Sequence, residues 1–145
     1  MKDGIFVHAN GTKEWYLLGK LHREDGPARE CPDGSLFWLQ NDELHREDGP
    51  AIERPDGTSE WWLRGKLHRE DGPAFRRPGS TTEFWVNGKF HREDGPAVEY
   101  VDGAKFWWIN DAMLTKEEFI KKVKKKKFTA SEIASLQRYG IEVDI

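Results

Sequence analysis

The sequence predicts a mainly β fold: an elongated, single-layer antiparallel β-meander of 23-residue repeats, capped by two short C-terminal α-helices. Three observations support this fold class. The heptapeptide HREDGPA occurs four times, starting at His22, His45, His68 and His91, and so defines a fixed period. Turn-forming dipeptides recur twice in each period. After Met113 both patterns stop and helix signals begin. We therefore expect a β-repeat array over residues 1–113 and a helical cap over residues 114–145.

Composition is consistent with a thin, ordered structure. The chain has 145 residues, of which 37% are hydrophobic and 34% charged, with seven Trp and eight Phe that argue against disorder. Cys31 is the single cysteine, which excludes an intramolecular disulfide and is compatible with a reducing cytoplasm. Residues 1–112 hold 15 Lys and Arg against 21 Asp and Glu, a net charge of −6, whereas the rest of the chain is basic. We find no signal peptide or membrane-spanning run and expect a cytoplasmic protein without membrane insertion.

Two series of turns divide each repeat into short strands. Asn and Gly readily adopt the positive φ of two-residue hairpin turns, so these dipeptides favour an antiparallel meander and leave little room for helix. Asn10-Gly11 lies one 23-residue period before Asp33-Gly34, so a degenerate repeat begins near Ile5. The first series is Asp33-Gly34, Asp56-Gly57, Gly79-Ser80 and Asp102-Gly103, and the second is Leu18-Gly19, Asn41-Asp42, Arg64-Gly65, Asn87-Gly88 and Asn110-Asp111.

Two-residue turns also predict which residues face each other across a hairpin. One face gains a continuous apolar column, which we expect to form the core: Tyr16/Leu21, Leu39/Leu44, Trp62/Leu67, Trp85/Phe90 and Trp108/Met113. Next to it we expect structural charge pairs between strands, with Phe37/Arg46 as the exception: Glu14/Arg23, Glu60/Arg69 and Glu83/Arg92. The other face pairs an aromatic residue with each repeat histidine: Trp15/His22, Trp38/His45, Trp61/His68 and Phe84/His91. Either one face is covered by another segment or it is an exposed aromatic groove, and these eight residues of the histidine face are the candidate binding residues.

The tail carries two helix signatures. Thr115 with Glu118, and Thr129 with Glu132, form capping boxes ahead of apolar stripes, and Gly140 suits the end of the second helix. We expect helices near 115–127 and 130–139 that cover the last strand of the sheet. A lysine run could contact nucleic acid or an anionic surface, but a solvated helix face is favoured: Lys121, Lys122, Lys124, Lys125, Lys126 and Lys127.

The period, the W…NGK…H…DG order and stretches such as TEFWVNGKFHREDGPAVEYVDG resemble the MORN repeat (membrane occupation and recognition nexus). The resemblance covers about Ile5 to Met113 and is greatest to MORN-like proteins of bacteriophages and large DNA viruses. It implies an elongated antiparallel sheet, and among family members roles as varied as lipid association and protein scaffolding. The spacing between the two turns departs from the usual MORN pattern, and DGP stands where that pattern has G-x-G.

Each of the four identical copies of His-Arg-Glu-Asp contains side chains that could act as general acids or bases. Catalysis, however, needs a single asymmetric arrangement of such groups in a pocket. We therefore expect no enzyme, no cofactor and no metal site. Asp-Gly-Pro favours a turn, and the small Ala fits beneath a neighbouring Trp. We therefore interpret the heptapeptide as the joint, the segment that connects one repeat to the next. The histidine has no structural explanation in this interpretation. We expect a functional site, if present, at the positions where the repeats differ from one another, which are residues 29–31, 52–54, 75–77 and 98–100, or in the tail.

The function expected from these features is a non-enzymatic binding or scaffold protein. The viral resemblance suggests a phage or viral accessory protein that binds and modulates a host protein in the host cytoplasm, for example by inhibiting a defence or nucleic-acid enzyme. One alternative is a protein that sequesters a nucleotide signal in a Trp/His/Arg groove. A weaker alternative is a DNA mimic, since the repeats are acidic. Direct nucleic-acid binding is expected only through the basic tail.

Overall fold

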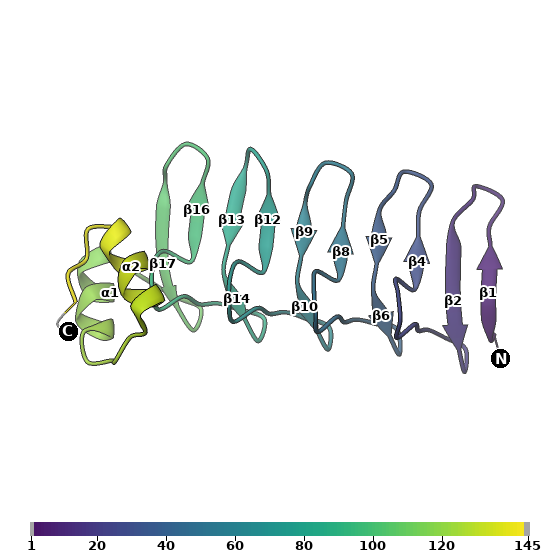
Figure 1. Ribbon diagram of the computed structural model, residues 1–145, viewed down its shortest axis with the longest axis horizontal. Helices are drawn as coiled ribbons and strands as arrows, with labels where there is room; N and C mark the ends of the chain where they lie inside the picture. Colours follow the sequence, from purple (N-terminus) through teal and green to yellow (C-terminus); the bar gives the residue numbers. More distant parts are fainter. Residues whose placement is uncertain (1, 144–145) are drawn as a thin grey trace.

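The computed structural model describes residues 2–143 and confirms the mainly β, elongated antiparallel meander with two C-terminal helices (Figure 1). Tall hairpins stand side by side in one row, with the N-terminus at one end and the helices at the other (Figure 1). Within the described residues, neighbouring strands along the main sheet are ordered β1-β2-β4-β5-β8-β9-β12-β13-β16-β17-β18, with β3 paired to β2.

Most strands are only two to five residues long because a turn signal interrupts the chain at short intervals. The main sheet contains β1 (Gly4–Val7), β2 (Lys13–Leu17), β3 (Lys20–Leu21), β4 (Arg29–Glu30), β5 (Leu36–Phe37), β8 (Ile52–Glu53), β9 (Ser59–Glu60), β12 (Phe75–Arg77), β13 (Thr81–Glu83), β16 (Val98–Tyr100), β17 (Lys105–Ile109) and β18 (Ala112–Leu114). Below it lie short separate hairpins, β6 (Leu39–Gln40) with β7 (Glu43–Leu44), β10 (Trp62–Leu63) with β11 (Lys66–Leu67), and β14 (Trp85–Val86) with β15 (Lys89–Phe90).

The predicted register of the two-residue turns is confirmed in every repeat. Leu39 lies opposite Leu44, and the other four pairs of the apolar column face each other in the same way. Both central residues of each turn have positive φ, for example 50° at Asn41 and 66° at Asp42. Leu18 and Arg64 also occupy this left-handed region, with φ of 51° and 48°, although neither side chain favours it.

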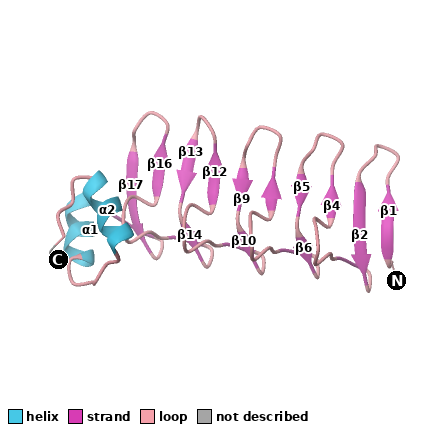
Figure 2. Cartoon of the chain, viewed as in Figure 1, coloured by secondary structure: helices cyan, strands magenta, loops and turns pink. Residues whose placement is uncertain are grey.

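The apolar column is half-buried rather than a closed core. Leu39 is buried, but Met113 is 60% exposed and the remaining members are partly exposed. The column lies on what we call the aromatic face, the sheet face that carries Tyr16, Leu39, Trp62, Trp85 and Trp108. Both helices gather at one end of the array, so within residues 2–143 no second layer covers this face (Figure 2).

The compact core lies at the C-terminal end. It contains Trp107, Ile109, Phe119, Val123, Leu136 and Ile141. Helices α1 (Lys116–Val123) and α2 (Ala130–Arg138) supply most of it and start at the two predicted capping boxes. The first helix ends at Val123, several residues before the predicted end, so most of the lysine run lies beyond it. Gly140 has a φ of 75° and donates to Gln137 O, while Ile141 donates to Leu136 O, which completes the predicted helix stop.

The helices replace a fifth joint. One period after Arg92 stands Thr115, so no arginine is available to cover Trp107. Instead Phe119 packs on Trp107 with ring centroids 4.6 Å apart, and Tyr139 meets it edge-on at 6.0 Å. The predicted capping role of the tail is therefore confirmed, because its helices cover the last hairpin of the sheet.

The strained turn at Leu18 leads to a stability prediction. The Leu18 side chain is 64% exposed, so Leu18→Asn relieves an unfavourable φ without loss of packing. We expect the free energy of unfolding to rise by roughly 0.5–1 kcal/mol in urea denaturation followed by circular dichroism. The reciprocal Asn41→Leu should lower it by a similar amount. A stabilising effect of both variants, or of neither, would contradict the assignment of strain to this turn.

Candidate functional site

The repeat histidines join each repeat to the next. The Nδ1 atom of His22 accepts a hydrogen bond of 3.1 Å from the backbone N–H of Asn41, in the hairpin turn of the following repeat. His45, His68 and His91 do the same for Arg64, Asn87 and Asn110, at 3.0, 2.9 and 3.1 Å. The Nε2 atom of each lies 3.4–3.6 Å from the glutamate two residues later. The histidine, which sequence reasoning left unexplained, is thus a structural acceptor.

Backbone bonds complete the joint. The N–H of Arg23 donates to Leu39 O of the next repeat at 3.1 Å, and Arg46, Arg69 and Arg92 make the equivalent bonds. At the N-terminal end Asp3 takes the place of a preceding histidine, since its Oδ1 accepts from the Leu18 N–H at 2.5 Å. The interpretation of the heptapeptide as the joint is therefore confirmed by its hydrogen bonds.

The arginine side chains cover aromatic rings. The guanidinium carbon of Arg23 lies 4.2 Å from the centroid of Trp15, and the same stack recurs at 3.9 Å for Arg46 on Trp38, Arg69 on Trp61 and Arg92 on Phe84. In each copy Nε donates to the aspartate two residues later and Nη1 to the proline carbonyl four residues later. We call the sheet face with these stacks the arginine face.

The predicted Glu–Arg pairs Glu14/Arg23, Glu60/Arg69 and Glu83/Arg92 are wrong. Glu14 bonds to Arg29 and His8, while Glu60 and Glu83 accept from the indole Nε1 of Trp62 and Trp85. The reason is that hairpin pairing ends at the histidine. The next residue, arginine, donates its backbone N–H to the following repeat, and its side chain stacks on an aromatic ring of the opposite sheet face.

The arginine face does not form the expected Trp/His/Arg groove along the array, although Phe84, His91 and Arg92 line a cleft of about 680 Å³ between the third copy and α2. Its rings are covered by guanidinium groups, and only 11–18% of each histidine side chain is exposed. The imidazole Nδ1 and the arginine Nε and Nη1 already have partners, so a nucleotide would have to compete with the joint itself. Within residues 2–143 no three His, Cys, Asp or Glu side chains lie close enough together to hold a metal ion.

A row of acidic side chains follows the joints. Glu24, Glu47 and Glu70 are 79–81% exposed, whereas Glu93 in the fourth copy is 36% exposed because the tail lies beside it. Each neighbouring aspartate is bonded to its own arginine, which reduces the local negative charge. This pairing weakens the likeness to a DNA phosphate backbone.

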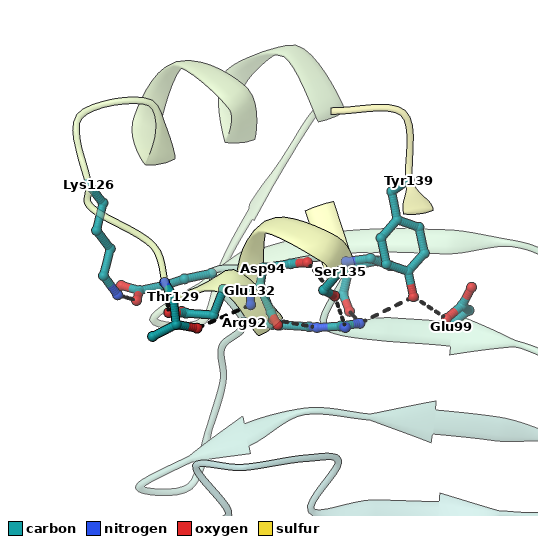
Figure 3. Close-up of polar contacts among 10 residues, drawn as sticks. Arg92, Asp94, Glu99, Lys126, Thr129, Glu132, Ser135 and Tyr139 are labelled. Atoms are coloured by element: carbon teal, nitrogen blue, oxygen red, sulfur yellow. Dashed lines mark hydrogen bonds and ion pairs between the residues drawn. The ribbon is translucent and has the colours of Figure 1, made fainter. Parts of the chain in front are cut away.

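The basic tail contributes one ion pair to the fourth joint. Lys126 pairs with Glu93, while Lys121, Lys122, Lys124, Lys125 and Lys127 are exposed on the tail. At the same joint, α2 lies over Arg92 (Figure 3). Arg92 Nη2 donates to Ser135 Oγ at 3.0 Å, Ser135 Oγ donates to the Asp94 carbonyl at 2.9 Å, and the Tyr139 hydroxyl donates to Glu99 at 3.1 Å. Neither Ser135 nor Tyr139 was expected in this role, because no local pattern links them to residues 40 or more positions away.

The positions at which repeats differ extend the aromatic face. Residues directly opposite each other share a face, and the register places Arg29, Ile52, Phe75 and Val98 in one row with Phe37, Glu60, Glu83 and Phe106. We therefore consider the aromatic face the candidate binding surface.

A hollow marks the C-terminal end of this face. It has a volume of about 270 Å³ and is lined by Glu83, Phe90, Val98, Tyr100, Phe106, Trp108 and Met113. Phe106 stands where Glu60 and Glu83 hold an indole N–H in earlier repeats, so Trp108 Nε1 has no hydrogen-bond partner among the described residues. Phe90 stacks between Trp85 and Trp108, with centroids 3.8 and 5.1 Å away. Apart from Glu83, the residues that line the hollow are apolar or aromatic.

The arginine stack can be tested with a glycine. A Cβ at Gly49 would lie 2.7 Å from the Arg46 guanidinium carbon, and Gly49 is not in the left-handed region. Gly49→Ala should displace the guanidinium and lower the free energy of unfolding by about 1–3 kcal/mol, as should Arg46→Ala. Because both changes disrupt one stack, the double variant should lose little more than either single variant in urea denaturation. Full additivity would show that the two residues act independently.

The histidine joint predicts a pH dependence. Burial lowers the pKa of His91 below its ordinary value, and the Lys126 ammonium lowers it further. A lowered folded-state pKa means that stability is complete above the unfolded-state pKa and is lost as pH falls through the folded-state value. His91→Asn keeps an acceptor for Asn110 but cannot titrate. Wild type should therefore lose more unfolding free energy than this variant between about pH 7.5 and 5. Equal losses would contradict the role of His91.

Comparisons with known proteins identify no family. A scan of the chain against protein-family models gives no match, and a search of the curated proteins gives none either. No helix within residues 2–143 is long and apolar enough to cross a membrane. The MORN-like resemblance therefore stays a prediction from the repeat pattern, and the function must be inferred from the geometry.

Proposed function

We propose that this protein is a non-enzymatic binding scaffold that holds a protein partner against its aromatic face. The observation that carries the proposal is the half-buried apolar column, which extends along the array without a covering layer in residues 2–143. A contiguous apolar surface of this kind marks a site of protein interaction in soluble proteins. The joints hold successive repeats in fixed positions, so the surface is organised before a partner binds.

The composition of the face favours a protein partner. Aromatic residues, Met and Arg are the residues enriched at protein interfaces. Tyr100, Phe106 and Met113 are 44%, 38% and 60% exposed around the hollow, where an apolar side chain of the partner would insert. Further along, Arg29 and Arg54 lie near the Phe37 ring, with guanidinium carbons 6.0 and 5.4 Å from its centroid, and supply charged contacts at the margin.

The biological setting proposed here comes from the repeat resemblance. A MORN-like protein of a phage or large DNA virus would act in the host cytoplasm, where binding to a host protein could inhibit a defence or nucleic-acid enzyme. The nucleotide alternative receives less support, because guanidinium groups cover the aromatic rings of the arginine face and are already hydrogen-bonded within the joints. The DNA-mimic alternative is weakened by the pairing of each joint aspartate with arginine.

Site-specific photocrosslinking tests the proposal. A photoreactive phenylalanine analogue at Met113 should form one discrete protein adduct in cells that express the chain, whereas the same analogue at Glu47, on the heptapeptide, should not. Phe106→Glu should abolish the Met113 adduct, because a carboxylate would be desolvated at the apolar interface at a cost of several kcal/mol. Folding of this variant is checked by circular dichroism. The absence of any adduct at Met113, or equal adducts at both positions, would contradict the proposal.

A further inference from the structure

The fourth heptapeptide is already bound by a helix. Helix α2 places Ser135 over Arg92 and Asp94, where its hydroxyl accepts from the guanidinium and donates to the backbone carbonyl (Figure 3). Lys126 pairs with Glu93 at the same joint. The Arg92 side chain is consequently 9% exposed, compared with 19–25% for its three counterparts.

The first three copies present the same groups without a helix. Their sequences are identical and their arginines make the same Nε and Nη1 bonds. Among residues 2–143, however, the Nη2 of Arg23, Arg46 and Arg69 has no counterpart of the Arg92–Ser135 bond, and no hydroxyl donates to the backbone carbonyl of Asp25, Asp48 or Asp71 as Ser135 does to that of Asp94. Each copy thus retains the donor and the acceptor with which the fourth copy binds Ser135.

A cleft adjoins the third copy. It has a volume of about 680 Å³, with Arg69, Glu70, Asp71 and Gly72 on one side and Ser131, Glu132, Ser135 and Arg138 of α2 on the other. Successive copies are two strands apart, about 10 Å, which matches the distance between packed helices. A helix placed on the third copy as α2 lies on the fourth would therefore pack directly beside α2.

We propose that this cleft is a docking site for an α-helical segment of a partner protein, with a serine or threonine of the helix over Arg69 and a lysine, just before the helix, beside Glu70. The site continues the interface that α2 makes with the fourth joint, and it lies on the opposite face from the surface proposed above. The hydroxyl would accept from Arg69 Nη2 and donate to the Asp71 carbonyl. The lysine is matched by Glu70, which is 81% exposed, whereas Glu93 already has Lys126.

The first experiment uses a peptide probe with the chemistry of the tail. A peptide of residues 126–139, KKFTASEIASLQRY, stapled within its helical residues 130–138, carries the serine on the helix and the lysine in the segment before it, as on the fourth joint. Its binding to the full chain is measured by fluorescence anisotropy. Glu70→Lys should weaken binding about tenfold, because it sets like charges against each other at the rim. Glu24→Lys, a matched exposed position in the first copy without an adjacent helix, should leave binding unchanged.

A spin label at Ser131→Cys locates the probe and separates the other outcomes. Broadening of the peptide's NMR signals, lost in Glu70→Lys, supports docking beside α2. No binding, or equal weakening by Glu70→Lys and Glu24→Lys, overturns the proposal. Binding that resists Glu70→Lys but requires release of α2 shows tail exchange and also overturns it. So does dimerisation of the chain alone that Glu70→Lys abolishes, since a second copy would then fill the cleft.

Discussion

The hydrogen bond from a hairpin-turn N–H to the histidine Nδ1 of the preceding repeat is the contact on which this structure depends. A single-layer sheet has no opposing layer to bury apolar surface, so its repeats must be fastened along the array. The imidazole reaches across each junction and fixes the position of the next turn. The backbone bond from the following arginine acts in parallel. The imidazole Nδ1 serves as the acceptor in this bond, so the tautomer that carries its hydrogen on Nε2 is the one that fits the joint.

The same heptapeptide supplies a local substitute for a core. Arginine covers an aromatic ring, aspartate holds the guanidinium, and the fully buried alanine allows the loop to lie close to the sheet. This explains how a chain with 34% charged residues keeps its tryptophans partly buried. The ring of Trp107 has no arginine to cover it, because the chain has no further copy of the heptapeptide after the fourth. Phe119 and Tyr139 cover this ring instead, and the buried core cluster forms there.

The two faces consequently differ in what they can bind. On the arginine face the residues of the heptapeptide hydrogen-bond to one another. In each of the first three copies, the groups that remain free to bind a partner are one edge of the guanidinium, one backbone carbonyl and one exposed glutamate. On the aromatic face the variable residues form a half-buried apolar surface that ends in a hollow at Phe106 and Met113. One fold can therefore combine constant joints with a surface that varies from repeat to repeat.

Local patterns in the sequence determined the repeat period, the hairpin registers and both capping boxes, because positive φ at two turn residues and a side chain three residues from a helix start act within a few positions. The partners of Arg23, Arg69 and Arg92 were mispredicted, since pairing stops at the histidine and no turn sets the register beyond it. Tertiary structure alone decided that the imidazole bonds to the next repeat, that the apolar column lacks a covering layer, and that Ser135 and Tyr139 close the fourth joint. Each of these depends on segments about 20 to 50 residues apart, which only the folded array brings into contact.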